Sequence, residues 1–194
     1  MGDGRMLFFE TCAKKFGFNR NGANLGAGAF GTVWPCKDKK YCVKIVSYAK
    51  KGEITAMLRL RGKKNKNVVF IKEVYIQGRM MAVVMERLKR LTWTQVEHID
   101  SFRRDSNSNF SSNNFISIHA GKCVKEMTSK HEQATCRQVQ AGAKELKKFG
   151  ITHTDIHGEN FMQDAKGNIK FIDLGLIRLR RDEGDKKLKP VIIK

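Results

Sequence analysis

Apolar residues in the first half of the chain recur in short runs whose length and spacing predict β-strands. Residues 24–46 contain three such runs, with a glycine-rich turn at residues 26–31. Residues 68–77 and 79–88 give two more, arranged as a hairpin. Pro35 has no N–H for a strand ladder, so we expect an edge or a bulge there. The pattern predicts five strands in this half of the chain.

One helix is expected between the third and fourth of these strands. Over residues 51–61 the apolar period changes, and Ile54, Met57 and Leu58 recur at the spacing of one helix face. Glu53 falls in the first turn, where the helix dipole favours a negative charge.

The second half of the chain is more polar, and from Thr92 onwards its character is helical. Residues 101–114 are rich in Ser and Asn and are expected to form a flexible loop. Residues 133–149 have a helical period, and residues 160–162 and 169–172 flank a turn as a second hairpin would. The expected fold class is therefore α+β, with strands and one helix first, then helices and a small hairpin.

Length and composition suit an ordinary globular protein. The 194 residues fit one large domain or two small lobes, and 41% of them are hydrophobic. No apolar run approaches the ~20 residues that a membrane helix needs. The five cysteines are scattered without a C-x-x-C pair, which favours reduced thiols. We expect an intracellular protein of the cytoplasm or nucleus.

The charge balance is strongly basic, with a formal net charge of +19. Such a charge either spreads over a solvated, lysine-rich surface or attracts an anionic partner. Nucleic acid, acidic lipid and acidic protein all fit the second interpretation. No nucleic-acid-binding motif accompanies the lysines, so the alternatives stay open.

The glycine-rich turn is the first candidate for chemistry. Gly26, Gly28 and Gly31 would let the backbone approach phosphate oxygens closely, with N–H groups as donors. Strands are expected on both sides of this turn, which disfavours a Rossmann turn because that turn opens a helix. Glycine-rich hairpins are common, so the turn alone decides nothing.

A lysine within an apolar strand is the second candidate. Burying Lys44 without a partner would cost on the order of 2–7 kcal/mol or force it to become neutral. Glu53 on the expected helix is the obvious counter-charge, and a phosphate of ATP is another. A lysine that extends its ammonium group to the surface is the competing interpretation.

Oxygen ligands near the end of the chain are the third candidate. Asp155 and Asn160 lie five residues apart, and Asp173 follows a short expected strand beside Leu174 and Gly175. Carboxylate and amide oxygens are suitable ligands for magnesium. Asn160 and Asp173 would hold the metal, which leaves Asp155 to orient or deprotonate a hydroxyl group.

In this order, these three motifs resemble the protein-kinase superfamily over about residues 24–176. The resemblance implies a two-lobe fold that fills residues 1–194 as one minimal kinase domain, with an N-lobe at 1–87 and a reduced, mainly helical C-lobe at 88–194. It implies that Lys44, Glu53, Asp155 and His157 are catalytic. It implies a nucleotide site made of Leu25, Gly26, Gly28, Phe30, Gly31, Val33, Cys42, Lys44, Met85, Glu86, Leu88 and Met162.

Four features depart from the pattern of the superfamily. Thr154 replaces the arginine that receives an activation-loop phosphate, and His157 replaces a lysine that steadies the γ-phosphate. Leu174 replaces a phenylalanine. Only residues 176–194 follow, so we expect neither a standard activation segment nor a peptide platform. The chain resembles the minimal kinases that viruses and pathogens carry.

The resulting expectation is an ATP- and magnesium-dependent serine/threonine protein kinase with an unknown protein substrate. Two alternatives remain. The H-x-D-x-H pattern that begins at His153 also occurs in aminoglycoside and choline kinases. A kinase-shaped binding module that uses its basic surface is the other.

Overall fold

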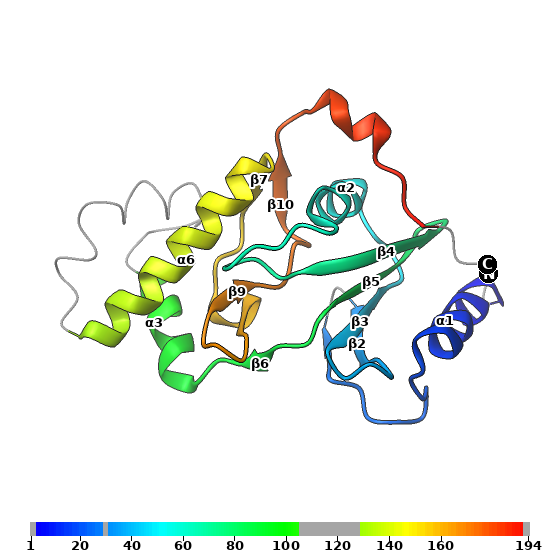
Figure 1. Ribbon diagram of the computed structural model, residues 1–194, viewed down its shortest axis with the longest axis horizontal. Coiled ribbons are helices and arrows are strands. Elements are labelled where there is room, and N and C mark those ends of the chain that lie inside the picture. The colour runs from blue at the N-terminus through cyan, green and yellow to red at the C-terminus, as the bar shows by residue number, and fades with distance from the viewer. Residues whose placement is uncertain (1–2, 29–30, 105–128, 192–194) are drawn as a thin grey trace. The chain divides into compact units, whose positions relative to one another are not determined.

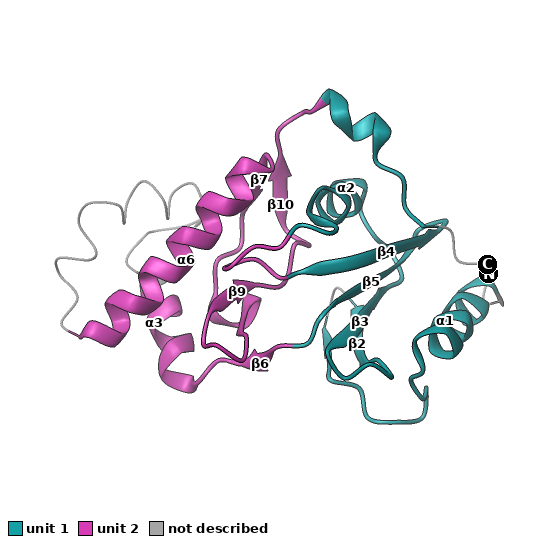
Figure 2. Ribbon diagram, in the orientation of Figure 1, with its two compact units in different colours: residues 1–63, 70–87, 183–194 teal, residues 64–69, 88–182 magenta. Residues whose placement is uncertain are grey.

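The computed structural model describes residues 3–28, 31–104 and 129–191, which form two compact units (Figure 2). Unit 1 comprises residues 1–63, 70–87 and 183–194, and unit 2 comprises residues 64–69 and 88–182. Residues 64–69 therefore belong to unit 2 although unit 1 flanks them in the chain, and residues 183–194 belong to unit 1 although they follow unit 2. The assignment of an N-lobe and a C-lobe stays a prediction.

Unit 1 is built on an antiparallel sheet with the strand order β1-β2-β3-β5-β4 (Figure 1). This confirms the five expected strands. Pro35 is the last residue of β2 and pairs with Cys42 of β3. The pairing of β2 with β1 ends at Val33, so no strand lies opposite Pro35 on that side to need the N–H that proline lacks. The strands are β1 (Gly26–Gly28), β2 (Gly31–Pro35), β3 (Tyr41–Val46), β4 (Ile71–Gln77) and β5 (Met80–Glu86).

One face of this sheet packs against a helix that the strand and helix patterns above did not include, α1 (Asp3–Phe16). Phe8 of α1 is fully buried. The Phe9 ring meets Trp34 edge-on at 5.5 Å between centroids, and Phe18 stacks on the same indole at 5.2 Å. Such aromatic pairs add to the stabilisation from apolar burial. The aromatic cluster thus fixes α1 to the sheet.

The expected helix of unit 1 is α2 (Lys51–Leu60). Its buried residues include Met57 and Leu58, as the helical spacing predicted, and also Glu53. Directly after the helix, the Gly62 N–H donates to the Ile71 carbonyl at the start of β4 (2.8 Å). Helix and strand are thereby joined at this end.

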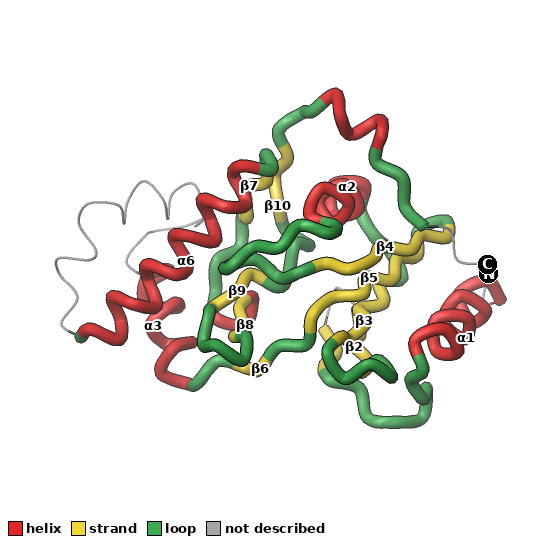
Figure 3. The backbone as a smooth tube through the Cα atoms, in the orientation of Figure 1, coloured by secondary structure: helices red, strands yellow, loops and turns green. Residues whose placement is uncertain are grey.

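Unit 2 combines helices with short strands (Figure 3). The expected hairpin is present as β8 and β9, whereas the two-stranded sheet of β7 and β10 was not predicted. Residues 101–104 belong to a helix rather than to the expected loop, and residues 105–114 lie outside the described part of the chain. The elements are β6 (Lys89–Arg90), α3 (Trp93–Arg104), α6 (Lys130–Lys148), β7 (Ile151–His153), β8 (Phe161–Gln163), β9 (Ile169–Phe171) and β10 (Ile177–Leu179).

The long helix α6 organises the packing of unit 2. Its N-cap is Ser129, whose hydroxyl oxygen accepts from the Glu132 N–H at 3.1 Å, so the helix begins three residues earlier than expected. Val139, Ala143 and Leu146 form its buried stripe, which confirms the helical spacing. Within the described ranges, no helix combines the length and apolar character needed to cross a membrane.

Residues 64–69 belong to unit 2 because Asn67 is buried against β9. Its Nδ2 donates to the Ile169 carbonyl at 2.8 Å, and its own carbonyl accepts from the Phe171 N–H at 3.1 Å. Gly142 of α6 lies so close that a Cβ there would come within 2.6 Å of the Asn67 carbonyl oxygen. The close approach therefore requires a glycine.

Gly142→Ala is expected to destabilise unit 2, because the added methyl group would meet the Asn67 backbone and the Phe171 ring. Overpacking of this kind typically costs about 1–3 kcal/mol. Denaturant unfolding measures the change in the free energy of unfolding. Lys144→Ala, at an exposed position of the same helix, is the control. Equal transition midpoints for the two variants would contradict the close approach.

Candidate active site

The glycine-rich turn joins β1 to β2, with Gly28 paired to Gly31. Gly31 has φ 131°, and a Cβ there would lie 2.3 Å from the Ile45 carbonyl oxygen, so the fold requires this glycine. At Gly26 and Gly28, the described residues beyond the chain neighbours place no atom within 4 Å of such a Cβ. Packing does not explain these two glycines, but close approach of a ligand to the backbone would. Phe30 lies outside the described residues.

Several predicted nucleotide contacts share one face of the sheet in unit 1. Lys44 lies opposite Val33 on β2 and Val83 on β5, and Cys42 lies opposite Met85. Residues directly opposite each other, and residues two apart in a strand, point to the same face. The alternate residues of β3 belong to the core under α1. The face that carries Lys44 is therefore the face of the sheet that α1 does not cover.

Two opposite charges are buried in unit 1. Lys44 is 7% exposed and Glu53 is 3% exposed. An ionised side chain is stable at such a depth only when an opposite charge or several hydrogen bonds compensate the lost hydration. The structure thus excludes the interpretation of Lys44 as a lysine that extends into solvent.

Glu86 ends β5 and anchors it to Phe70. The Phe70 N–H donates to Glu86 Oε1 at 2.7 Å, and the Glu86 N–H donates to the Phe70 carbonyl at 3.0 Å. Both groups of Glu86 therefore hold the strand end, and its backbone carbonyl accepts from the Cys42 thiol at 3.7 Å. The other predicted contacts are half-buried: Leu25 in unit 1, and Leu88 and Met162 in unit 2.

His153 ties together the two loops of unit 2 that carry the candidate metal ligands. Its ring is 1% exposed. Nδ1 accepts from the Asp155 N–H at 3.2 Å, and Nε2 donates to the Asp173 carbonyl. Burial lowers the pKa of His153, although the hydrogen bond to Asp173 acts in the opposite direction. A neutral imidazole with its proton on Nε2 satisfies both bonds.

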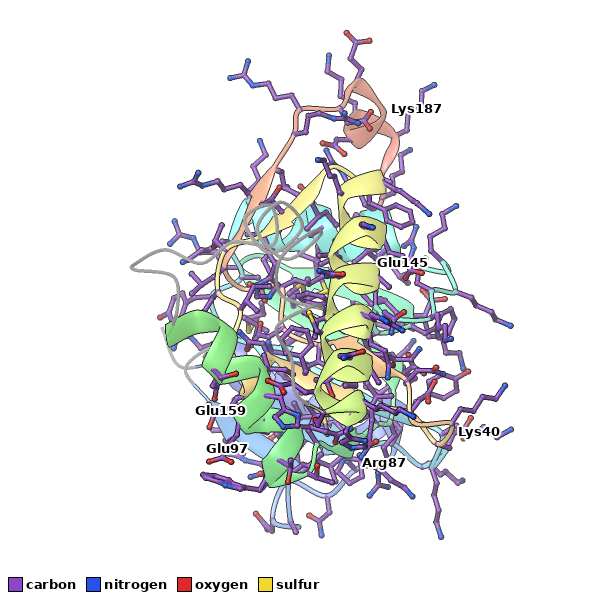
Figure 4. The ribbon with its side chains drawn as sticks, turned by 90° about the vertical axis from the view of Figure 1, so that its left-hand side faces the viewer. Lys40, Arg87, Glu97, Glu145, Glu159 and Lys187 are labelled. Carbon is purple, nitrogen blue, oxygen red and sulfur yellow. The ribbon has the colours of Figure 1, made fainter. Side chains whose placement is uncertain are left out.

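The loop after β7 brings two of the four predicted catalytic residues, Asp155 and His157, together with the predicted metal ligand Asn160, whereas Lys44 and Glu53 belong to unit 1. Asn160 is buried in the short 3-10 turn η2 (Gly158–Asn160), and its Nδ2 donates to the Asp155 carbonyl at 2.8 Å. His157 Nε2 lies 3.2 Å from Asp155 Oδ2. Glu159, labelled in Figure 4, is exposed. The loop thus presents a carboxylate with an imidazole beside it.

Asp173 is held next to this loop. Its Oδ1 accepts from the Gly175 N–H at 2.9 Å, and the Ile172 N–H donates to the Asn160 carbonyl at 3.1 Å. Leu174 is fully buried, so it fills an apolar position. The amide nitrogen of Asn160 is directed at Asp155, so a cation would be held by the amide oxygen of Asn160 and by the carboxylate of Asp173. These are the hard oxygen ligands that magnesium prefers.

Sequence reasoning missed two supports of this loop. His153 was not proposed as a site residue, although it begins the same motif. Asp100 of α3 accepts from the Gly158 N–H through Oδ1 at 2.7 Å. A Cβ on Gly158 would lie 2.5 Å from Val96, which fixes how closely loop and helix approach. Asp100 lies 58 residues from Gly158 in the chain, so no local sequence pattern could predict this hydrogen bond.

Comparison with known proteins gives one consistent result. The protein kinase domain family matches residues 20–190. The serine/threonine-protein kinase ste20 of Aspergillus fumigatus is 25% identical over 181 residues, which is 89% of this chain and 19% of that protein. The serine/threonine-protein kinase pakA of Talaromyces marneffei is 23% identical over 182 residues, 92% of this chain and 24% of that protein. The chain thus spans about a fifth of the length of these relatives.

The buried His153 predicts that stability decreases at mildly acidic pH. The unfolded chain takes up a proton near pH 6.5, whereas the lowered pKa keeps the folded ring neutral to a lower pH. The free energy of unfolding should therefore fall below pH 6.5, by at most about 1.4 kcal/mol per pH unit. Denaturant unfolding at pH 7.5, 6.5 and 5.5 measures this slope.

Two variants isolate the contribution of that ring. His153→Asn should lower stability at every pH but reduce the slope between pH 6.5 and 5.5. His131→Asn, at an exposed position, should have the same slope between pH 6.5 and 5.5 as the wild type. An unchanged slope in His153→Asn would rule out the neutral, buried imidazole.

Proposed function

This chain belongs to the protein kinase domain family, and from that membership we propose that it transfers the γ-phosphoryl group of ATP to serine or threonine side chains of a protein substrate. The names of the matched relatives support the choice of serine and threonine. Because the chain covers only a fifth of those relatives, activity and substrate are our proposals.

One observation carries the proposal. In unit 2, Asp155, Asn160 and Asp173 are joined by hydrogen bonds through His153 and through the Asn160 amide. The network holds two magnesium-type oxygen ligands and a separate carboxylate in one small region. A loop with only a structural role would not need this combination.

The proposed roles follow from the chemistry of each side chain. ATP with magnesium would supply the phosphoryl group and the charge neutralisation that its transfer requires. Asn160 and Asp173 would hold the metal, and Asp155 would accept the proton of the substrate hydroxyl. Lys44, with Glu53 as its counter-charge, would orient the phosphates. The glycine-rich turn would cover those phosphates with backbone N–H groups.

His157 is proposed to assist Asp155 rather than to act on the substrate by itself. At 3.2 Å from Oδ2 it can orient the carboxylate and, when protonated, add a positive charge near the transferred group. The same histidine is the feature that this loop has in common with small-molecule kinases. A phosphotransfer assay must therefore include small alcohols as acceptors.

The basic surface points to an acidic partner for unit 1. Three lysines (Lys15, Lys37 and Lys72) line a cavity of about 460 Å³, together with the acidic Asp38 and Glu73 and with apolar and aromatic side chains. The ammonium groups of Lys15 and Lys72 lie over the rings of Tyr75 and Tyr41, at 5.1 Å and 4.3 Å. We propose that this lysine-lined region binds a polyanionic segment of a partner.

Lys44→Met and Asp173→Asn should each reduce the phosphotransfer rate by at least about 100-fold, because electrostatic positioning of the phosphates carries most of the catalysis. The measurement is transfer from labelled ATP to a mixture of acidic and basic proteins, with and without magnesium. Lys40→Met and Glu97→Gln, at exposed positions of units 1 and 2, are the charge-matched controls. The controls should keep wild-type rates.

The same assay separates the alternatives. Transfer to an aminoglycoside or to choline, but to no protein, would favour a small-molecule kinase. Binding of ATP without any transfer would favour a non-catalytic module. Wild-type rates in both Lys44→Met and Asp173→Asn would contradict the proposed site.

Binding of heparin or DNA should weaken steeply with salt, since each neutralised phosphate contributes a slope of about −0.9 to log K against log salt. The measurement is the dissociation constant between about 50 and 200 mM salt. Lys37→Glu with Lys72→Glu should weaken binding and make the slope less steep. Lys63→Glu with Lys64→Glu reverses the same number of charges away from the cavity and is the control. Equal effects of both pairs would indicate a diffuse, solvated surface.

A further inference from the structure

A charged pair joins α2 to residues 183–191, more than a hundred residues further along the chain. Arg59 Nε donates to Asp185 Oδ1 at 2.8 Å, and Nη2 donates to Oδ2 at 2.7 Å. The arginine side chain is 6% exposed and that of the aspartate 31%. The guanidinium group lowers the pKa of Asp185. Paired hydrogen bonds of this kind fix geometry as well as contributing energy.

The same segment makes further hydrogen bonds to the rest of unit 1, among them one from the Ile76 N–H to the Val191 carbonyl at 3.4 Å. Arg61 Nη1 donates to the Lys189 carbonyl at 2.9 Å. The Val191 N–H donates to the Val74 carbonyl of β4 at 3.0 Å, so the segment pairs with an edge strand. Figure 1 shows the segment passing from η3 (Glu183–Lys187) over α2 to the end of β4. It therefore contacts both the helix and the strand against which the helix packs.

Little apolar burial holds this segment. Lys187 projects into solvent (Figure 4), and of residues 183–191 only Asp185, Leu188 and Pro190 are partly buried. A segment of this length without a core of its own is held chiefly by its polar attachments. The Arg59–Asp185 pair joins two opposite charges through two hydrogen bonds, so the docking of the segment depends strongly on it.

We propose that residues 183–191 form an intramolecular clamp on α2, and that Arg59 and Asp185 are positioning residues for Glu53. Glu53 lies in the first turn of α2 and Arg59 in the last, about 9 Å apart along the axis. The burial of Glu53 fixes the first turn of the helix, and the hydrogen bonds from Arg59 to Asp185 fix the last turn. The helix is thus fixed at both ends, which keeps the Glu53 carboxylate at the depth of Lys44. This inference rests on the proposed function.

Asp185→Asn tests the clamp, because it keeps the shape of the side chain and removes its charge. We expect amide hydrogen exchange in α2 to become about tenfold faster, with exchange in β3 and β5 unchanged. We expect kcat for phosphotransfer to fall about tenfold and KM for ATP to change less than twofold, since the affected interaction positions the phosphates. Asp185→Glu keeps the charge and should restore most of kcat.

Glu183→Gln is the matched control, since it removes the same charge from an exposed position of the same turn. It should change neither exchange nor kcat. An equal loss of kcat in Glu183→Gln and Asp185→Asn would overturn the clamp, because it would show that net charge alone matters. Unchanged exchange in α2 of Asp185→Asn would also overturn it.

Failure of the two proposals can be distinguished. If exchange in α2 becomes faster but kcat is unchanged, the clamp exists and the positioning role is wrong. If the wild-type protein transfers no phosphate to any acceptor, the proposed function fails. Hydrogen exchange then still decides whether the segment holds α2.

Discussion

A buried lysine on the face of the sheet opposite α1 is the constraint on which unit 1 depends. Lys44 is almost inaccessible to water in a strand whose neighbours are apolar, and a charge at that depth requires a negative partner. The requirement fixes where α2 must lie, since this helix carries the buried Glu53. It also gives the sheet two unlike faces. The aromatic residues under α1 stabilise one face, and the other is kept for a charge that a purely structural sheet would avoid.

In unit 2, a neutral side chain supports the site. His153 is buried as a neutral ring, and its two nitrogens bond backbone groups of Asp155 and Asp173. Because it bonds to the backbone, the ring sets the positions of two acidic residues while leaving their carboxylates to other partners. A charged group in its place would have to be compensated by those same carboxylates. A neutral hydrogen-bonding residue is thus the better support for a site whose acids must stay available.

The sequence predicted the local elements well. Short apolar runs bounded by turn residues predicted the five strands of unit 1, and the helical period predicted α2 and α6. The spacing of Asp155 and Asn160 also predicted a shared loop correctly. The helix α1 could have been found in the same way, since Phe8, Cys12 and Phe16 recur every four residues. The exposed apolar residues Met6 and Leu7 beside it obscured that stripe.

What the sequence could not show is the set of partners that lie far away along the chain. Asp100 holds Gly158 across 58 residues, and Arg59 holds Asp185 across 126. Each of these residues is ordinary in its own neighbourhood, and only the fold brings a partner to it. Chemistry-bearing residues cluster in short motifs because one loop must present them together. The residues that position them come from whichever element packs nearby, so their identity follows from tertiary structure. A site can therefore be recognised from its motifs well before its supports are known.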